Sequence, residues 1–236
     1  QMKSLKLNGM AIAYETMLSM PHYKQPHLHE AIATMIDAEA QQRHLRRTTM
    51  LVRLSKLRYK ASVHDIIFND KRNLPKAKVQ ALMDCSFIQH AHNITITGST
   101  GTGKSYLACA LGHQACLMGY KTLYFNMNKF VETLSIAKMD GSFVKWINRL
   151  SKTHLIILDD FGLQPIDQNV KLALLQILED RYQNHATIIS SQIPPSKWYE
   201  YFDDPEQQQG SMYPAALPQR PVRRGRSRRT RLRWFS

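Results

Sequence analysis

The residues best suited to chemistry form one short stretch in the middle of the chain. Residues 93–105 read NITITGSTGTGKS, and the part from Gly98 onward matches the phosphate-binding pattern G-x-x-x-x-G-K-[S/T]. Glycines let successive backbone N–H groups converge on phosphate oxygens, and the lysine adds a point charge for the β- and γ-phosphates. The serine hydroxyl would bind Mg²⁺. The stretch predicts a nucleotide site made by Gly98, Ser99, Thr100, Gly101, Thr102, Gly103, Lys104 and Ser105.

Two carboxylates follow an apolar run further along. Residues 155–158 read LIIL and are followed by Asp159 and Asp160. Four apolar residues predict a fully buried parallel strand, and ligands bind at the carboxyl ends of such strands. We expect Asp159, with Ser105, to hold Mg²⁺, and Asp160 to polarise the attacking water. The alternative, a pair of acids at a helix start, fits less well because Phe161-Gly162 follows.

A third polar site is expected at the end of another strand. The strand predicted over 186–190 is followed by Ser191 and Gln192. A polar side chain there would face the γ-phosphate and sense the nucleotide state, so Ser191 joins Lys104 and Asp160 as a candidate catalytic residue. A plain turn is the alternative.

These sites need a scaffold that brings separate strand ends together. Strand-like segments over 94–97, 121–125, 155–158 and 186–190 alternate with amphipathic helical segments over about 127–138, 142–151 and 168–183. Alternating strands and helices predict an α/β domain, with a parallel sheet between two helical layers. We expect this P-loop domain over residues 76–206.

The region before it, residues 1–75, is predicted to be helical. Apolar residues recur at helical spacing over about 4–19 and 28–57, and no acidic residue lies between Glu39 and Asp65. The second helix carries a run of cations that could release counterions from a phosphate backbone. A solvated charged face is the alternative. The candidate DNA-binding residues are Arg43, Arg46, Arg47, Arg53, Lys56, Arg58 and Lys60.

The positive charge of the chain is concentrated at its two ends. The 236 residues include 32 Lys and Arg against 18 Asp and Glu, which gives a net charge of +14. Residues 1–90 carry +7, residues 91–206 carry −1 and residues 207–236 carry +8. The last segment holds eight arginines and several prolines, so we expect disorder there. It is either a basic nucleic-acid tail or the product of translation in a shifted reading frame.

Composition argues against several other classes of protein. No apolar run approaches the roughly 18 residues of a membrane span, and no signal peptide is evident, so a cytoplasmic location without membrane contact is expected. Three cysteines without a CxxC pair argue against a disulfide scaffold or zinc module. The pairs His27–His29 and His90–His92 lack a third ligand at metal spacing, so solvated histidines are expected.

The strings GSTGTGKSYLACALGHQAC, LIILDDFGLQP and TIISSQIPPSKWYE, together with LKLNGMAIAYE near the start, resemble the IstB family of insertion-sequence ATP-binding proteins. These are relatives of the DnaC helicase loader in the AAA+ class. The resemblance covers about residues 4–204. It implies ATP and Mg²⁺ as cofactors, double-stranded DNA and a transposase as partners, and homo-oligomers on DNA. It also implies Walker A roles for Lys104 and Ser105, Walker B roles for Asp159 and Asp160, and a sensor position near Ser191.

The resemblance ends at Asp203-Asp204-Pro205, where the family continues into a helical lid that contributes a trans-acting arginine. Within the ATPase module Arg181 is the candidate replacement, although pairing on a helix surface is the alternative. We therefore expect nucleotide binding with weak or absent hydrolysis. A DnaC-like loader of a replicative helicase and a non-hydrolysing DNA-binding remnant are the rival functions.

Overall fold

The computed structural model describes residues 1–68, 74–198 and 232–233, and the chain divides into two compact units at Leu51/Val52. The predicted disordered tail, residues 207–236, lies outside the described residues except for the short strand Leu232–Arg233. Among the described helices none is long and apolar enough to cross a membrane. Each unit is taken by itself below.

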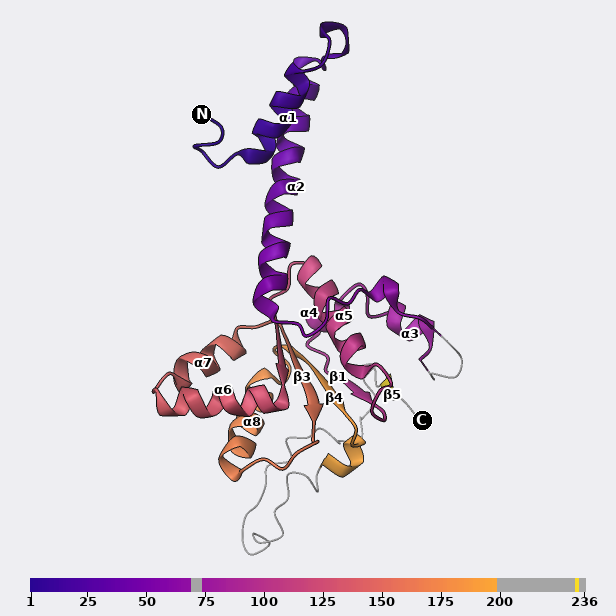
Figure 1. Ribbon diagram of the computed structural model, residues 1–236, viewed down its shortest axis with the longest axis vertical. Coiled ribbons are helices and arrows are strands. Elements are labelled where there is room, and N and C mark those ends of the chain that lie inside the picture. Colours follow the sequence, from indigo (N-terminus) through magenta and orange to yellow (C-terminus); the bar gives the residue numbers. More distant parts are fainter. Residues whose placement is uncertain (69–73, 199–231, 234–236) are drawn as a thin grey trace, which may run out of the picture. The chain divides into compact units, whose positions relative to one another are not determined.

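The first unit is a helical hairpin (Figure 1). Helix α1 (Asn8–Leu18) is followed by the 3-10 turn η1 (His22–Lys24) and by the long helix α2 (Leu28–Ser55), of which the part up to Leu51 belongs to this unit. Gly9 lies so close to α2 that a Cβ there would collide with the backbone of Ala38.

A carboxylate from α2 accepts hydrogen bonds from the first backbone N–H groups of α1. Residue Leu7 offers α1 no side-chain cap, and Glu39 Oε2 instead accepts hydrogen bonds from the backbone N–H groups of Gly9 (2.8 Å) and Met10 (3.3 Å). The first N–H groups of a helix have no intrahelical partner, and a negative charge there also interacts favourably with the positive end of the helix dipole. Arg43 pairs with the other Glu39 oxygen at 2.8 Å. The glycine and the carboxylate together fix the crossing of the two helices.

The second unit contains a parallel sheet in the order β2-β3-β4-β1-β5 (Figure 1). The strands are β1 (Ile94–Thr97), β2 (Thr122–Asn126), β3 (Leu155–Phe161), β4 (Ala186–Ser191) and β5 (Leu232–Arg233). Every pairing between neighbours is parallel. Strands β1 and β3 both pair with β4 in parallel, so their carboxyl ends lie at the same edge of the sheet. The start of the P-loop and the two aspartates therefore meet at that edge.

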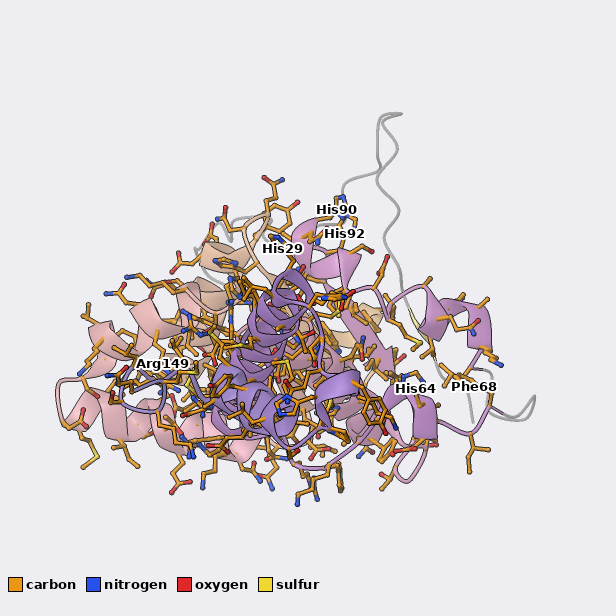
Figure 2. The ribbon with its side chains drawn as sticks, turned by 90° about the horizontal axis from the view of Figure 1, so that it is seen from above. His29, His64, Phe68, His90, His92 and Arg149 are labelled. Carbon is orange, nitrogen blue, oxygen red and sulfur yellow. The ribbon has the colours of Figure 1, made fainter. Side chains whose placement is uncertain are left out.

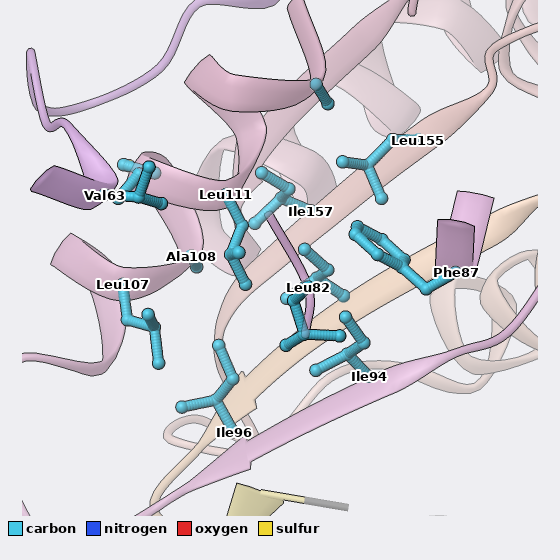
Figure 3. Packing of buried hydrophobic residues seen from close by; sticks show 14 of the residues in the cluster. Val63, Leu82, Phe87, Ile94, Ile96, Leu107, Ala108, Leu111, Leu155 and Ile157 are labelled. Carbon is cyan, nitrogen blue, oxygen red and sulfur yellow. The ribbon is translucent and has the colours of Figure 1, made fainter. Parts of the chain in front are cut away.

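Helices cover both faces of this sheet. One layer contains α3 (Lys76–Gln80), α4 (Ser86–Gln89) and the central α5 (Lys104–Leu117). The other contains α6 (Met127–Met139), α7 (Phe143–Ser151) and α8 (Gln168–Arg181). Alternate residues of β3 divide between the layers: Leu155 and Ile157 pack on the α5 side (Figure 3), while Ile156 and Leu158 pack on the α6–α8 side. The predicted three-layer α/β fold is confirmed.

The chain between α2 and α3 belongs to the core of the second unit. It includes the 3-10 turn η2 (Val63–Asp65), and Ala61, Val63 and Leu74 are buried in the same hydrophobic cluster as residues of β1 and α5. Figure 3 shows Val63 near α5. The division between the units therefore falls earlier in the chain than residue 75, where the sequence pattern suggested it. Apolar contacts of these residues with the sheet, rather than helical periodicity, decide where they belong.

Arg181, at the end of α8, lies neither on a helix surface nor at an exposed position from which it could act across an interface. Its side chain is only 1% exposed. The guanidinium donates hydrogen bonds to the carbonyl oxygens of Leu150 and Thr153, each at 2.7 Å, and also to those of His154 and Ala186. Burial lowers the pKa of Arg181 to about 10. The expectation of a surface ion pair or an interfacial arginine was wrong: Arg181 binds together the chain segments before β3 and β4.

Candidate nucleotide-binding site

The phosphate-binding loop lies between β1 and α5. Gly101 and Gly103 have φ values of +82° and +88°, a conformation that residues with a Cβ rarely adopt, and helix α5 begins at Lys104. Helix α5 is long enough, at 14 residues, to present a full set of unpaired N–H groups at its start. Hydrogen bonds to the Ser99 carbonyl from the Thr102 hydroxyl (2.9 Å) and the Lys104 ammonium (2.7 Å) fold the loop on itself.

Lys104 is held inside the site. Its side chain is 6% exposed, although the flanking loop residues Ser99, Thr100 and Gly101 are exposed. Burial lowers the pKa of Lys104, while the nearby carboxylates of Asp160 and Asp159 oppose the shift. A buried ammonium that faces two carboxylates is the electrostatic arrangement expected where polyphosphate and a divalent cation bind together.

Asp159 has no exposed surface, and two hydroxyls fix its orientation. Tyr124 of β2 donates a 2.6 Å hydrogen bond to Oδ2, and Ser190 of β4 donates one to Oδ1. Each oxygen keeps a lone pair for another ligand. Carboxylate oxygens oriented in this way are the kind of ligand that Mg²⁺ prefers, and the Ser105 hydroxyl at the start of α5 would be a second oxygen donor.

Asp160 lies next to Asp159 at a local irregularity of β3. The pairing register with β4 shifts between Leu158 and Phe161, and Asp160 has φ = +60°. Successive side chains of a regular strand point to opposite faces, and the irregularity relaxes this constraint at the two acids. Asn126 Nδ2 donates a 2.6 Å hydrogen bond to Asp160 Oδ2. Burial and the Asp159 charge raise the pKa of Asp160.

Ser191 and its neighbour Ser190 have different hydrogen-bond partners at the end of β4. The Ser191 hydroxyl is buried, donates to the Phe161 carbonyl oxygen (2.7 Å) and accepts from the Ile193 N–H (3.0 Å). Ser190 instead contacts both acids, because its hydroxyl bonds Asp159 and accepts from the Asp160 N–H at 3.4 Å. Adjacent residues of a strand face opposite sides, so Ser190 is the residue that contacts the two acids, and the sensor role expected of Ser191 stays a prediction.

Arg58 belongs to this site although the sequence pattern grouped it with the DNA-contacting cations. Helix α2 ends at Ser55, and Lys56 has φ = +54°, which redirects the chain. Arg58 then places its guanidinium nitrogen 3.7 Å from Asp160 Oδ2. Its guanidinium also lies over the Tyr59 ring, 5.2 Å from the centroid.

A cavity of about 210 Å³ adjoins the phosphate loop at Thr102 and Gly103. Apolar side chains from the segment before α3 and from α5 form much of its wall, and Thr102 and Gly103 form its edge with the loop. The lining residues are Asp65, Ile66, Ile67, Leu74, Thr102, Gly103, Tyr106 and Leu107.

The other candidate DNA-binding residues are exposed. Arg43 and Arg46 belong to the first unit, where Arg43 pairs with Glu39 and Arg46 faces the amide of Asn8. Arg47 is exposed in the same unit. The remaining members, Arg53, Lys56 and Lys60, are exposed in the second unit together with Arg58.

Histidines form no additional site. His90 and His92 stack at 5.6 Å between ring centroids (Figure 2), and His90 Nδ1 lies 2.8 Å from the Ser86 carbonyl oxygen. No group of three or more His, Cys, Asp or Glu side chains within residues 1–68 and 74–198 could hold a metal.

Residues 1–211 match the profile of IstB-like ATP-binding proteins. The chain belongs to this family. It is 36% identical over 197 residues to the ATP-binding protein named for insertion sequence IS1162 of Pseudomonas fluorescens, which covers 83% of this chain and 85% of the relative. It is 37% identical over 204 residues to the insertion-sequence ATP-binding protein y4uH of Sinorhizobium fredii, with 86% of this chain and 82% of the relative covered.

Two solved structures share the fold of the IstB-like chain. Replication initiator DnaA bound to AMPPCP and single-stranded DNA superposes with a TM-score of 0.55 at 24% identity, over 60% of this chain and 44% of that one. The DnaC helicase loader gives a TM-score of 0.52 at 20% identity, over 60% and 84%. The expected family and fold are confirmed, and membership implies nucleotide binding at the P-loop.

Four residues that contact Asp159 or Asp160 were not assigned to this site from the sequence: Tyr124, Asn126, Ser190 and Arg58. A signal existed for one of them, Asn126. The strand that contains Tyr124 ends in Asn126, just as the acidic strand ends in Asp159 and Asp160, so a polar residue at that end was a candidate. The contact of Arg58 carried no such signal, because it depends on a turn after a long helix.

Proposed function

We propose that this IstB-like chain is an ATP-dependent, DNA-binding helper of transposition. The observation that carries the nucleotide part is the phosphate loop with Lys104 buried at its centre beside Asp159 and Asp160. Insertion-sequence ATP-binding proteins at 36–37% identity support the cellular context. In this proposal a partner transposase is the protein that the ATP-bound, DNA-bound form recruits.

The loop's N–H groups and Lys104 would bind the triphosphate, and the cavity lined by Ile66, Ile67 and Tyr106 would take the less polar base and sugar. Ser105 and Asp159 would hold Mg²⁺, which supplies charge neutralisation between the phosphates. Asp159 suits this role because Tyr124 and Ser190 already fix its two oxygens.

In hydrolysis, water oxygen bonds to the γ-phosphorus while the bond from that phosphorus to the β–γ bridging oxygen breaks, giving ADP and phosphate. Asp160 would accept the water proton. Its raised pKa makes it a better base than an ordinary carboxylate. Asp160→Asn is therefore expected to spare nucleotide binding and reduce turnover by about 100-fold or more.

Double-stranded DNA is the proposed ligand of the basic residues along and after α2. Exposed Arg43, Arg46, Arg47, Arg53, Lys56 and Lys60 would contact phosphates, and homo-oligomers on DNA would follow from the family resemblance. Phosphate contacts make affinity fall with salt in proportion to the number of neutralised charges.

Anisotropy of a labelled duplex tests this DNA proposal directly. The parent is expected to bind more tightly with ATP and Mg²⁺ than without. Charge reversal of Arg46, Arg47 and Arg53 to Glu should weaken binding and reduce its salt slope by about three or more. A matched triple reversal on α7 and just after it, at Lys145, Arg149 and Lys152, should preserve the slope. Equal effects of the two triple reversals would refute the assignment of DNA to the basic residues of α2.

A further inference from the structure

One ion pair connects the segment after α2 to the candidate catalytic acid. Arg58 is three residues past the end of α2, and its guanidinium lies 3.7 Å from Asp160 Oδ2. The side chains are 50% and 26% exposed, so solvent and ligands can reach the pair. Asn126 donates to the same oxygen at 2.6 Å. One of the two Asp160 oxygens, Oδ2, is therefore engaged by a hydrogen bond from Asn126 and by the ion pair with Arg58.

The pair also occupies a place that a catalytic water would need. Asp160 Oδ2 faces both the Arg58 guanidinium and the Asn126 amide, so a water at that oxygen has to compete with both groups.

The contact is also of a kind that a polyanion can displace. At 3.7 Å the guanidinium makes one long contact, and partly exposed ion pairs of this sort are weak. Arg53, Lys56 and Lys60, which flank Arg58 in the sequence, are exposed cations of the same unit. A phosphate backbone bound by these neighbours would compete with Asp160 for Arg58.

We propose that Arg58 is a positioning residue that restrains Asp160 until DNA phosphates bind the cations around it, so that DNA releases the base and stimulates ATP hydrolysis. The inference rests on the proposed function, because it requires both a nucleotide at the P-loop and DNA near Arg58. In this proposal the ion pair between Arg58 and Asp160 is a cause of the slow hydrolysis expected from the sequence.

Steady-state ATP turnover of the full chain, with and without saturating duplex DNA, tests the proposal. Arg58→Ala should raise turnover without DNA by about two- to fivefold, which matches the strength of an exposed ion pair. DNA should then add little further stimulation. Arg58→Lys, which keeps a charge, should restore part of the restraint. Arg149→Ala on α7 removes an exposed arginine far along the chain (Figure 2) and should behave as the parent.

A second background separates positioning from a general structural effect. In Asp160→Asn the acid is absent, so adding Arg58→Ala should leave turnover unchanged, and the two substitutions should be non-additive. The proposal is overturned if Arg58→Ala lowers turnover, leaves it at the parental level, or keeps full stimulation by DNA. It is also overturned if parent and variant both bind nucleotide yet neither hydrolyses it.

Failure of the underlying function has a separate signature. If Lys104→Ala binds ATP as tightly as the parent, the nucleotide site itself is misassigned. If nucleotide binding depends on Lys104 while turnover ignores Arg58, the site stands and the restraint does not exist.

Discussion

The phenol of Tyr124 donates a 2.6 Å hydrogen bond to Asp159 Oδ2, which ties the second strand to the acid at the end of the third. Tyr124 is 8% exposed and Asp159 is fully buried. The same contact, with burial as the larger cause, raises the pKa of Tyr124 far above its ordinary value. The tyrosine therefore stays protonated as a donor, and the carboxylate is oriented before any metal arrives.

Replacing Tyr124 with Phe removes this donor and little else. The buried Asp159 oxygen then loses its partner, so the free energy of unfolding should fall by about 1–3 kcal/mol. Chemical denaturation measures the change. Tyr120→Phe is the control, because the Tyr120 hydroxyl only accepts a bond from the exposed Gln89 side chain. A loss for Tyr120→Phe as large as that for Tyr124→Phe would contradict the account.

Arg181 should be the most costly arginine of the second unit to replace. Arg181→Met would leave the Leu150, Thr153 and Ala186 carbonyl oxygens buried without their donor, and we expect a loss of about 3–5 kcal/mol. Arg181→Lys should recover only part of this, because an ammonium cannot reach all three oxygens. Thermal unfolding monitored by circular dichroism gives the comparison. Unchanged stability in both variants would show that the Arg181 hydrogen bonds contribute nothing to the free energy of unfolding.

Glu39 should make the first unit sensitive to acid. The hydrogen bond from Arg43, followed by those from Met10 and Gly9, holds the pKa of Glu39 below its ordinary value against the effect of burial. A lowered folded-state pKa means that the carboxylate stabilises the hairpin above the ordinary glutamate value, and that this stabilisation is lost as pH falls through the lowered value.

Hydrogen exchange of the Gly9 and Met10 amides reports this transition. Protection factors should decrease in the parent as pH falls below about 4.5, the ordinary value for a glutamate in this context. Glu39→Gln keeps an acceptor without the titration, so its protection should be lower at neutral pH and nearly independent of pH. Parallel curves for the two proteins would rule out Glu39 as the titrating group.

The fold was largely predictable because its signals are local. Strand β3 was recognised from four consecutive apolar residues and two acids, and the P-loop from the spacing of Gly98, Gly103 and Lys104. What could not be predicted depends on tertiary geometry. The placement of Ser190 rather than Ser191 depends on strand facing, and the burial of Arg181 depends on carbonyl oxygens from two distant segments.

The contact of Arg58 shows the same limit from another direction. By charge pattern it is one of seven cations, and nothing in its neighbours distinguishes it. Lys56 has a left-handed backbone conformation that redirects the chain after α2, and Arg58 then lies within ion-pair distance of Asp160. A residue's role here depends on where the helix ends, and helix ends are the least certain part of a sequence-based prediction.

Nucleotide affinity of the parent and of Lys104→Ala tests the central claim most directly. Titration with a fluorescent ATP analogue and Mg²⁺ should give saturable binding by the parent. Loss of the buried ammonium should weaken it by about 10- to 100-fold, the value of a charge-assisted hydrogen bond to phosphate. Lys121→Ala, an exposed lysine just before β2, should bind as the parent does. Equal affinity of the parent and Lys104→Ala would contradict the assignment of this loop as the nucleotide site.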